Sequence, residues 1–203
     1  MTYPTFQEEQ LLWNQGYQHI AGVDEVGRGC FAGPVVTAAV ILPQHFTSPK
    51  PINDSKKLSA KARTELAEVI KQQAIAFAIA EISVDIINAV GIGEATQEGF
   101  RSAINQLTKQ PDYILIDAFY IKKLSKHNQK PIIHGDGISI SIAAASIIAK
   151  VYRDELMQKL HEKYEAYDFA TNKGYGTKKH RGAIGKYGLC NLHRKSFDLS
   201  KFV

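Results

Sequence analysis

The sequence predicts an α/β layered protein with one main core. Short runs of β-branched and other apolar residues alternate with longer stretches in which apolar residues recur every three or four positions. Strands and helices mixed in this way pack as layers around a sheet. The chain has 203 residues, 44% hydrophobic and 22% charged, which is enough for one well-filled core.

Five segments are expected to form strands. Each is rich in β-branched or small apolar residues and is bounded by turn-forming or charged residues. They are residues 20–24, 35–42, 75–82, 113–117 and 132–134.

Helical periodicity follows the second strand and dominates the later part of the chain. Ser59 can cap a helix that extends to Gln73, a second helix is predicted over 94–109, and Thr177 can cap a short final one. The longest helix is predicted over 141–164. Its first half is apolar nearly all round and its second half is amphipathic, so we expect its start to be buried against the sheet and its end to reach water.

Hydropathy and cysteine usage indicate a cytoplasmic protein. No apolar run approaches the ~20 residues of a membrane-spanning helix, and the polar first ten residues lack the basic region of a secretory signal. The two cysteines, Cys30 and Cys190, stand in no CxxC or Cys/His cluster, which argues against a disulfide framework or a structural zinc site. We expect no membrane contact, and nothing demands more than a monomer.

Positive charge is concentrated near the C-terminus. Residues 1–149 hold 13 Lys and Arg against 14 Asp and Glu, whereas 150–203 hold 12 against 6. Within 169–197, called the basic segment below, there is no acidic residue, and Tyr175, Tyr187 and His193 are interleaved with the cations. This composition suits nucleic acid, although a solvated basic face is the alternative. We divide the chain into a catalytic core, 1–165, and a basic C-terminal subdomain packed on it, 166–203.

Acidic residues follow three of the predicted strands. Asp24 and Glu25 end "IAGVDE", Asp117 ends "YILID" and Asp136 ends "PIIHGD". Residues just beyond strand ends line the ligand crevice of open α/β sheets, so these four residues, called the acid cluster below, are expected in one pocket. Crowded carboxylates repel one another unless a hard divalent cation compensates them. Two Mg²⁺ or Mn²⁺ ions can activate a water and stabilise the leaving oxygen of a phosphodiester, which together with the basic segment predicts a metal-dependent nuclease.

Structural roles are the alternative for several of these acids. Asp117 or Asp136 taken alone could be a cap or turn residue, whereas a pair such as Asp24-Glu25 directly after an apolar strand is harder to explain in that way. Asp154, within a predicted helix and beside Arg153, is expected to form surface or helix-end ion pairs.

Six short motifs occur in a fixed order along the chain: "AGVDEVGRGCFAGPVV", "INDSKKLS", "YILIDA", "HGD", "SIAAASIIAKVYRD" and "NKGYGT". In this order and spacing they resemble type 2 ribonuclease H (bacterial ribonuclease HII) over nearly the whole chain. The resemblance implies a ribonuclease H-like fold, with a central mixed five-stranded sheet flanked by helices and a C-terminal helical extension. It also implies an endonuclease with two divalent metal ions, Mn²⁺ or Mg²⁺. Such an enzyme hydrolyses the RNA strand of RNA/DNA hybrids and incises 5′ of ribonucleotides embedded in duplex DNA, leaving 3′-hydroxyl and 5′-phosphate ends.

The resemblance further implies roles for matching residues. The acid cluster, Asp24, Glu25, Asp117 and Asp136, matches the metal ligands. Gly27, Arg28 and Gly29, called the GRG turn below, match the reader of the ribose 2′-hydroxyl, which acts largely through backbone groups. Tyr175 matches the tyrosine that packs against the sugar at the RNA-to-DNA junction. A 2′-hydroxyl distinguishes RNA from DNA locally, and glycines allow the backbone to approach it closely. Packing within a turn is the structural alternative for Tyr175.

Other polar residues could contact the substrate backbone. Lys56 and Lys57, with Arg28, are candidates for phosphate contacts, although a lysine before a helix is otherwise an ordinary solvated charge. Ser139 and Ser146 either seat a phosphate or pack near the start of the long helix. A sliding-clamp-like protein partner is left open.

Two rival functions use part of the same features. A junction resolvase or a transposase-like catalytic core would share the acids but should lack the GRG turn and the "KGYG" tyrosine. A non-catalytic module that binds hybrids would keep the basic segment without needing the acids.

Overall fold

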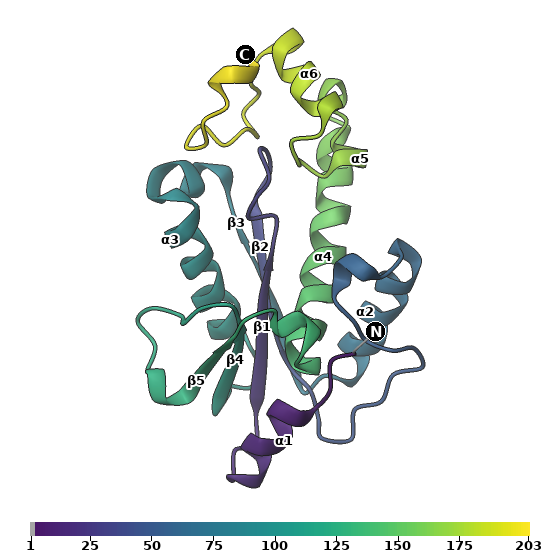
Figure 1. Cartoon of the computed structure of the whole chain (residues 1–203), viewed down its shortest axis with the longest axis vertical. Coiled ribbons are helices and arrows are strands. Elements are labelled where there is room, and N and C mark those ends of the chain that lie inside the picture. Colours follow the sequence, from purple (N-terminus) through teal and green to yellow (C-terminus); the bar gives the residue numbers. More distant parts are fainter. Residues whose placement is uncertain (1–2) are drawn as a thin grey trace.

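The computed structural model describes residues 3–203, which fold around a five-stranded mixed sheet (Figure 1). The strand order is β3-β2-β1-β4-β5. The pairs β1/β2 and β2/β3 are antiparallel, whereas β1/β4 and β4/β5 are parallel, as the resemblance implied. The strands are β1 (Ile20–Val26), β2 (Val35–Ile41), β3 (Ala76–Ile82), β4 (Tyr113–Asp117) and β5 (Gln129–Ile132).

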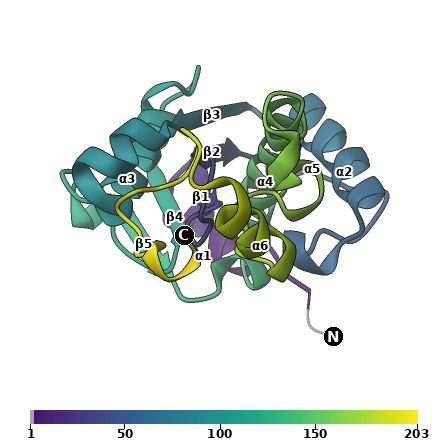
Figure 2. The ribbon, with the colours of Figure 1, turned by 90° about the horizontal axis from the view of Figure 1, so that it is seen from above.

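Helices cover both faces of the sheet, which confirms the layered α/β fold (Figures 1 and 2). The helix α3 (Val84–Asn105) packs on one face, and α2 (Ala60–Gln73) and α4 (Ile140–His161) pack on the other. Every residue of β2 is buried, since this strand has covering helices on both sides. The short 3-10 helices are η1 (Ser55–Lys57), η2 (Lys126–Asn128), η3 (Gly135–Gly137), η4 (Glu165–Tyr167) and η5 (Ser200–Phe202).

The long helix α4 approaches β1 at van der Waals distance. At Gly22 of β1, an added Cβ would lie 2.0 Å from the carbonyl carbon of Ser141, so only glycine fits there. Residues 141–149 of α4 are all buried, whereas only three of the later residues are: Val151, Arg153 and Met157. The predicted change from an apolar first half to an amphipathic second half is therefore confirmed.

Some predicted boundaries were wrong. The helix α3 begins at Val84 and not at residue 94, because Ser83 caps it and a kink at Gly91, with φ of 77°, joins two helical pieces. The strand β5 lies at Gln129–Ile132 and not at 132–134: the apolar Ile133 that suggested a later strand is 72% exposed. The helix α1 (Gln7–Asn14) was not predicted, because its apolar side chains pack mainly against residues of the sheet and of α4, most of which are distant in sequence.

The C-terminal segment lies at the end of α4 and of the β1–β2 hairpin (Figure 1). It contains α5 (Phe169–Asn172) and α6 (Lys178–Tyr187), the latter capped by Thr177 as predicted. A separate apolar cluster joins this segment to the core; its buried members are Ala32, Met157, Tyr167, Phe169 and Ala183. Within residues 3–203, no helix has the length and hydropathy needed to cross a membrane.

Candidate functional site

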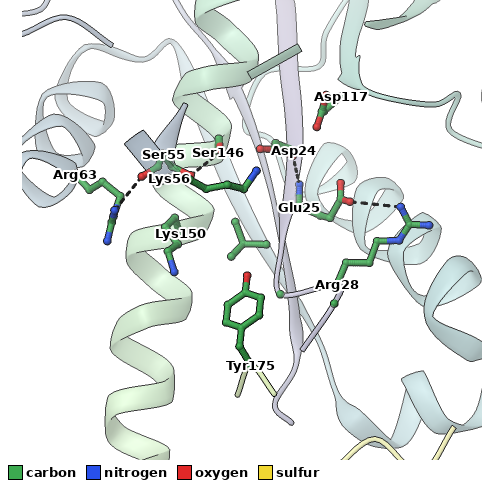
Figure 3. A pocket seen from close by; sticks show the side chains of 13 residues that line it. Asp24, Glu25, Arg28, Ser55, Lys56, Arg63, Asp117, Ser146, Lys150 and Tyr175 are labelled. Carbon is green, nitrogen blue, oxygen red and sulfur yellow. Dashed lines mark hydrogen bonds and ion pairs between the residues drawn. The ribbon is translucent and has the colours of Figure 1, made fainter. Parts of the chain in front are cut away.

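Two acids of the acid cluster lie side by side on the central parallel strands. In the β1/β4 register, Val23 pairs with Ile116, so Asp24 and Asp117 are the next residues on each strand. Asp24 points toward Ser146 of α4, whereas Glu25 points to the other side of β1, toward Arg28 (Figure 3). This divergence follows from the strand itself, since successive side chains alternate between the two faces of a sheet.

A cavity of about 580 Å³ opens beside these acids (Figure 3). Three members of the acid cluster line it together with four cationic side chains, the GRG turn and a few polar groups. The lining includes Asp24, Glu25, Asp117, Arg28, Lys56, Arg63, Lys150, Ser55, Ser146 and Tyr175. Oxygen ligands, cations and an aromatic ring therefore share one open space.

The fourth acid, Asp136, lies next to this cavity and not in its wall. It belongs to η3, is 7% exposed, and its carboxylate lies 3.6 Å from the Nζ of Lys56. The peptide N–H of Gly135 donates a 2.7 Å hydrogen bond to Oδ1 of Asp117. The turn that carries Asp136 is thereby fixed to the end of β4, so the fourth acid is held close to the other three.

Burial and mutual repulsion perturb these carboxyl groups. Burial, followed by the charge of Glu25, raises the pKa of Asp24 well above its ordinary value, although a hydrogen bond from Ser146 opposes the shift. Burial also raises the pKa of Glu25 to about 7, against the lowering effect of Arg28. The pKa of Asp136 is raised by burial and by the neighbouring Asp54, with Lys56 opposing. The cluster thus carries more negative charge than its protein neighbours offset.

The donor set fits a hard divalent cation. All four groups are carboxylates, which are the ligands that Mg²⁺ and Mn²⁺ prefer, and a bound cation would offset the burial and repulsion that raise the pKa values of Asp24, Glu25 and Asp136. Within residues 3–203, however, no three Asp, Glu, His or Cys side chains converge closely enough to form a ready metal-binding group. Glu25 in particular faces away, 3.8 Å from the guanidinium of Arg28. Metal ligation by these residues stays a prediction.

The GRG turn is held from behind by a buried arginine. Arg194 has no exposed surface, and its guanidinium donates to the carbonyl oxygens of Gly27, Arg28 and Gly33 at 2.7 to 3.0 Å. A second buried arginine, Arg153, donates to the carbonyls of Pro34, Ala32 and Lys173. The sequence reading counted Arg194 among the cations of a segment suited to nucleic acid, and that part was wrong: this residue is an internal brace.

The two glycines of the GRG turn differ in their surroundings. Gly27 has φ of 91°, and an added Cβ would lie 2.1 Å from Nε of Arg153, so internal packing alone requires glycine there. At Gly29, an added Cβ would meet no atom within 4 Å. Packing within the protein therefore explains the glycine at position 27. It does not explain Gly29, which has open space on the cavity side. The Arg28 side chain lies over the ring of Phe119, 4.8 Å from its centroid.

Tyr175 and Lys56, two of the predicted substrate-contacting residues, point into the cavity (Figure 3). Tyr175 is 41% exposed and Lys56 is 77% exposed at its side chain. Burial by itself would lower the pKa of the Lys56 amine, but the surrounding acids, Asp136 first, raise it. Lys57 is exposed and is not among the residues that line the cavity.

The two serines that the sequence left open have different roles. Ser139 is fully buried, donates to the carboxylate of Glu9 at 2.6 Å and caps α4, so its role is structural. Ser146 lies in the cavity wall, 3.0 Å from the hydroxyl of Ser55. It therefore links the "NDSKK" loop to α4 directly beside Asp24.

Two of the four cations that line the cavity were not found from the sequence. Lys150 and Arg63 both line the cavity, and Asp154 pairs with each of them, at 2.6 Å and 3.5 Å. The ion pairs expected of Asp154 are therefore present, but they lie at the wall of the cavity. The spacing of Lys150 and Asp154, four residues apart on one helix, was a usable signal for this pair.

An open mixed sheet with adjacent carboxylates at its strand ends, beside a cavity lined by cations, is the arrangement of a nuclease of the ribonuclease H-like class. Solved structures share this fold. One is the ribonuclease H2 from Pyrococcus horikoshii OT3, with a TM-score of 0.72 and 23% identity over 90% of this chain and 95% of that one. Another, in the PCNA:RNase HII complex from Archaeoglobus fulgidus, has a TM-score of 0.69 and 27% identity over 87% and 92%.

The chain belongs to the ribonuclease HII family, since the family model described as Ribonuclease HII matches residues 21–200. A Ribonuclease HII of Listeria monocytogenes serotype 4b is 55% identical over 94% of this chain and 72% of its own length. A Ribonuclease HII of Syntrophus aciditrophicus is 47% identical over 94% and 89%. The protein is thus a type 2 ribonuclease H, an endonuclease.

Proposed function

We propose that this endonuclease hydrolyses the RNA strand of RNA/DNA hybrids and incises 5′ of single ribonucleotides embedded in duplex DNA. The products would carry 3′-hydroxyl and 5′-phosphate ends. One observation carries the proposal: the acids at the ends of β1 and β4 share a cavity with the GRG turn and with Tyr175. Groups suited to hydrolysing a phosphodiester and groups suited to recognising a ribose therefore face the same space.

The acid cluster, Asp24, Glu25, Asp117 and Asp136, would hold two divalent ions, Mg²⁺ or Mn²⁺. When bound, such ions supply an activated water and stabilisation of the leaving oxygen. The shared all-oxygen donor set and the raised pKa values of Asp24, Glu25 and Asp136 support this assignment. A related solved structure, Bst-RNase HIII in complex with Mn²⁺, has a TM-score of 0.66 at 20% identity.

The chain's own groups would orient the substrate. The backbone of the GRG turn would contact the 2′-hydroxyl, which both donates and accepts hydrogen bonds, and the open space at Gly29 leaves room for a sugar. The ring of Tyr175 would pack on the following deoxyribose, where a 2′-oxygen does not fit. Lys56 and Arg28 would contact phosphates, because both cations line the same cavity as the acids.

The rival functions fit less well. A junction resolvase or a transposase-like core does not need a GRG turn or a tyrosine beside its acids, and a non-catalytic module does not need buried, mutually repelling carboxylates. We propose a monomer that acts in the cytoplasm. A sliding-clamp-like partner would be an addition to this site and not a part of it; the complex of a related RNase HII with PCNA motivates a search for one.

The test is cleavage of three labelled duplexes, with and without Mn²⁺ or Mg²⁺: DNA with one ribonucleotide, a long RNA/DNA hybrid, and all-DNA. We expect metal-dependent incision 5′ of the single ribonucleotide, cleavage of the hybrid, and none of all-DNA. Cleavage of branched all-DNA junctions would instead support the resolvase function. Tight binding without cleavage under every metal condition would support the non-catalytic module.

A further inference from the structure

A buried pair of histidines lies behind the turn that carries Tyr175. His180 of α6 and His193 of the following loop have no exposed surface, and their Nε2 atoms are 3.1 Å apart. Their ring centroids are 5.2 Å apart. Neither ring lines the cavity beside the acids, and the proposed function gives neither histidine a role.

The contacts at the outer nitrogens decide which ring atom carries each proton. Nδ1 of His180 lies 2.9 Å from the carbonyl oxygen of Tyr175. A carbonyl oxygen only accepts, so this nitrogen holds a proton. The peptide N–H of Cys190 donates to Nδ1 of His193 at 2.9 Å, so that nitrogen is bare; the alternative contact, with the Cys190 oxygen, is longer at 3.3 Å.

The inner contact then has a single direction. A neutral imidazole carries one proton, so Nε2 of His180 is an acceptor and Nε2 of His193 is a donor. Burial lowers the pKa of both rings, that of His193 to about 4, which keeps both neutral at neutral pH. The hydrogen bonds therefore run one way, from Cys190 N–H to His193, from His193 to His180, and from His180 to the Tyr175 carbonyl.

This series of hydrogen bonds has one end at the Tyr175 turn and reaches the segment that directly follows the GRG turn. At one end, the Tyr175 carbonyl accepts both His180 Nδ1 and the peptide N–H of Thr177, the latter at 2.8 Å. At the other end, His193 forms a β-bridge with Ala32, just after the GRG turn. Aromatic rings enclose the pair: Tyr167 lies 4.9 Å from His193 and Phe169 lies 5.4 Å from His180, centroid to centroid.

We infer that His180 and His193 are positioning residues for Tyr175: their directed hydrogen bonds fix the Tyr175 backbone relative to the GRG turn. The pair thereby sets the spacing between the group that reads the ribose and the ring that reads the next sugar. This inference rests on the proposed function of Tyr175. Because the pair touches no substrate, its effect is on where a junction is accepted and not on the hydrolysis itself.

The first test measures the ring protons directly. Nitrogen-15 spectra of the histidine rings at pH 7.5 should give a proton on Nδ1 of His180 and on Nε2 of His193, with the other two nitrogens bare. The opposite tautomer on either ring, or a charged ring, would overturn the inferred direction of these hydrogen bonds. This readout does not involve cleavage, so it stands apart from the proposed function.

The second test compares His180→Phe with His180→Asn. The phenylalanine keeps an aromatic ring but loses the donor, whereas the asparagine amide can still donate to the Tyr175 carbonyl. The quantity compared is the ratio of kcat/KM at a single ribonucleotide to kcat/KM on a long hybrid. We expect His180→Phe to lower this ratio about tenfold and His180→Asn to restore most of it. Thermal melts accompany both variants. A folded His180→Phe protein with the wild-type ratio would overturn the inference.

Tyr175→Ala, measured on the same two substrates, distinguishes a failure of the positioning role from a failure of the function proposed for Tyr175. If Tyr175→Ala lowers the ratio and His180→Phe does not, the positioning role is wrong while the proposed function of Tyr175 stands. If Tyr175→Ala itself leaves the ratio unchanged, the proposed junction role is wrong, and the positioning role falls with it. Equal losses in His180→Phe and His180→Asn would indicate packing alone and would also overturn the inference.

Discussion

The edge of the sheet and the C-terminal segment carry charge in opposite ways. At the ends of β1 and β4, the buried Asp24 lies beside the partly buried Glu25 and Asp117, and Lys56 and Arg28 offset these acids only in part. In the C-terminal segment, the buried Arg194 is satisfied by backbone carbonyls, while Lys178, Arg181 and Lys186 are exposed. The edge of the sheet keeps an excess of negative charge that a bound cation can offset. In the C-terminal segment, the buried positive charge of Arg194 is already satisfied by hydrogen bonds within the protein.

The comparison separates charges that act on a ligand from charges that hold the fold. A buried acid whose charge is not offset by a neighbouring cation weakens the metal-free protein, so removing it should lower activity and raise stability. A buried cation whose donors are hydrogen-bonded to backbone carbonyls stabilises the protein, so its removal should mainly lower stability. The predictions below test this contrast, from the largest expected effect to the smallest.

The largest effect is expected at the acids. Asp24→Asn and Asp117→Asn should each lower cleavage at least about a hundredfold, because even the outer partners of metal ligands contribute 10–100-fold. Binding of the hybrid should survive. In metal-free buffer at pH 8, Asp24→Asn should raise the free energy of unfolding by about 0.5–2 kcal/mol, measured with urea. Full activity in both variants would refute the metal assignment.

The matched change in the C-terminal segment is Arg194→Met beside Lys195→Met. Arg194→Met removes the guanidinium donor from the carbonyls of Gly27, Arg28 and Gly33. Within residues 3–203, only that of Gly27 keeps another backbone hydrogen bond, from Cys30 at 3.2 Å, so the change should lower the free energy of unfolding by about 3 kcal/mol. The neighbouring Lys195 is exposed, and its replacement should stay within about 0.5 kcal/mol of the wild type. Similar values from the two denaturation curves would contradict the brace assigned to Arg194.

A third prediction concerns the open space in the GRG turn. Gly29→Ala meets no protein atom, so the thermal midpoint should not fall, yet the new methyl group should lower kcat/KM at a single ribonucleotide about tenfold or more if a sugar lies there. Gly182→Ala, at another position with open space around the Cβ, is the control for activity. An unchanged kcat/KM in Gly29→Ala would remove the turn from the substrate site.

The charge imbalance also predicts a pH dependence. The pKa of Glu25, about 7 in the metal-free protein, lies above its ordinary 4.5, so the folded state binds more protons and loses stability as pH rises from 4.5 through 7. Below pH 7 a proton on Glu25 competes with the metal. The Mn²⁺ concentration for half-maximal cleavage should therefore rise by up to about tenfold per pH unit below 7 and level off above it. Glu25→Gln should make the pH dependence of Mn²⁺ binding, measured by calorimetry, shallower between pH 4.5 and 7, since Asp24 and Asp136, whose pKa values are also raised, remain.

The smallest effect is expected at the exposed cations. Lys178→Ala should weaken hybrid binding and lower the slope of log K against log salt by about 1 if this amine contacts a phosphate. Lys109 is exposed and precedes β4, at the end of the strand away from Asp117, so Lys109→Ala is the control. A slope equal to that of the wild type would leave the Lys178 charge without a role in binding.

Local patterns were sufficient for most of the fold. Ser59 and Thr177 each cap the helix that follows, as predicted, and the apolar run of 141–149 is buried along its whole length. The prediction of α3 began ten residues late, because the glycine-containing stretch around Gly91 interrupts the periodicity although the helix continues through a kink. The helix α1 and the short strand β5 depend on contacts distant in sequence, which periodicity does not report.

The sequence by itself determined the family and predicted the acid cluster and the GRG turn as its site, because chemistry that needs particular residue types leaves them in recognisable motifs. Only the tertiary structure decided that Arg194 is an internal brace, that Glu25 faces away from Asp24, and that His180 and His193 join behind Tyr175. The physical reason is that burial and hydrogen-bond direction depend on neighbours brought from distant parts of the chain. Two arginines or two histidines that look alike in sequence acquire different roles only when those neighbours are in place.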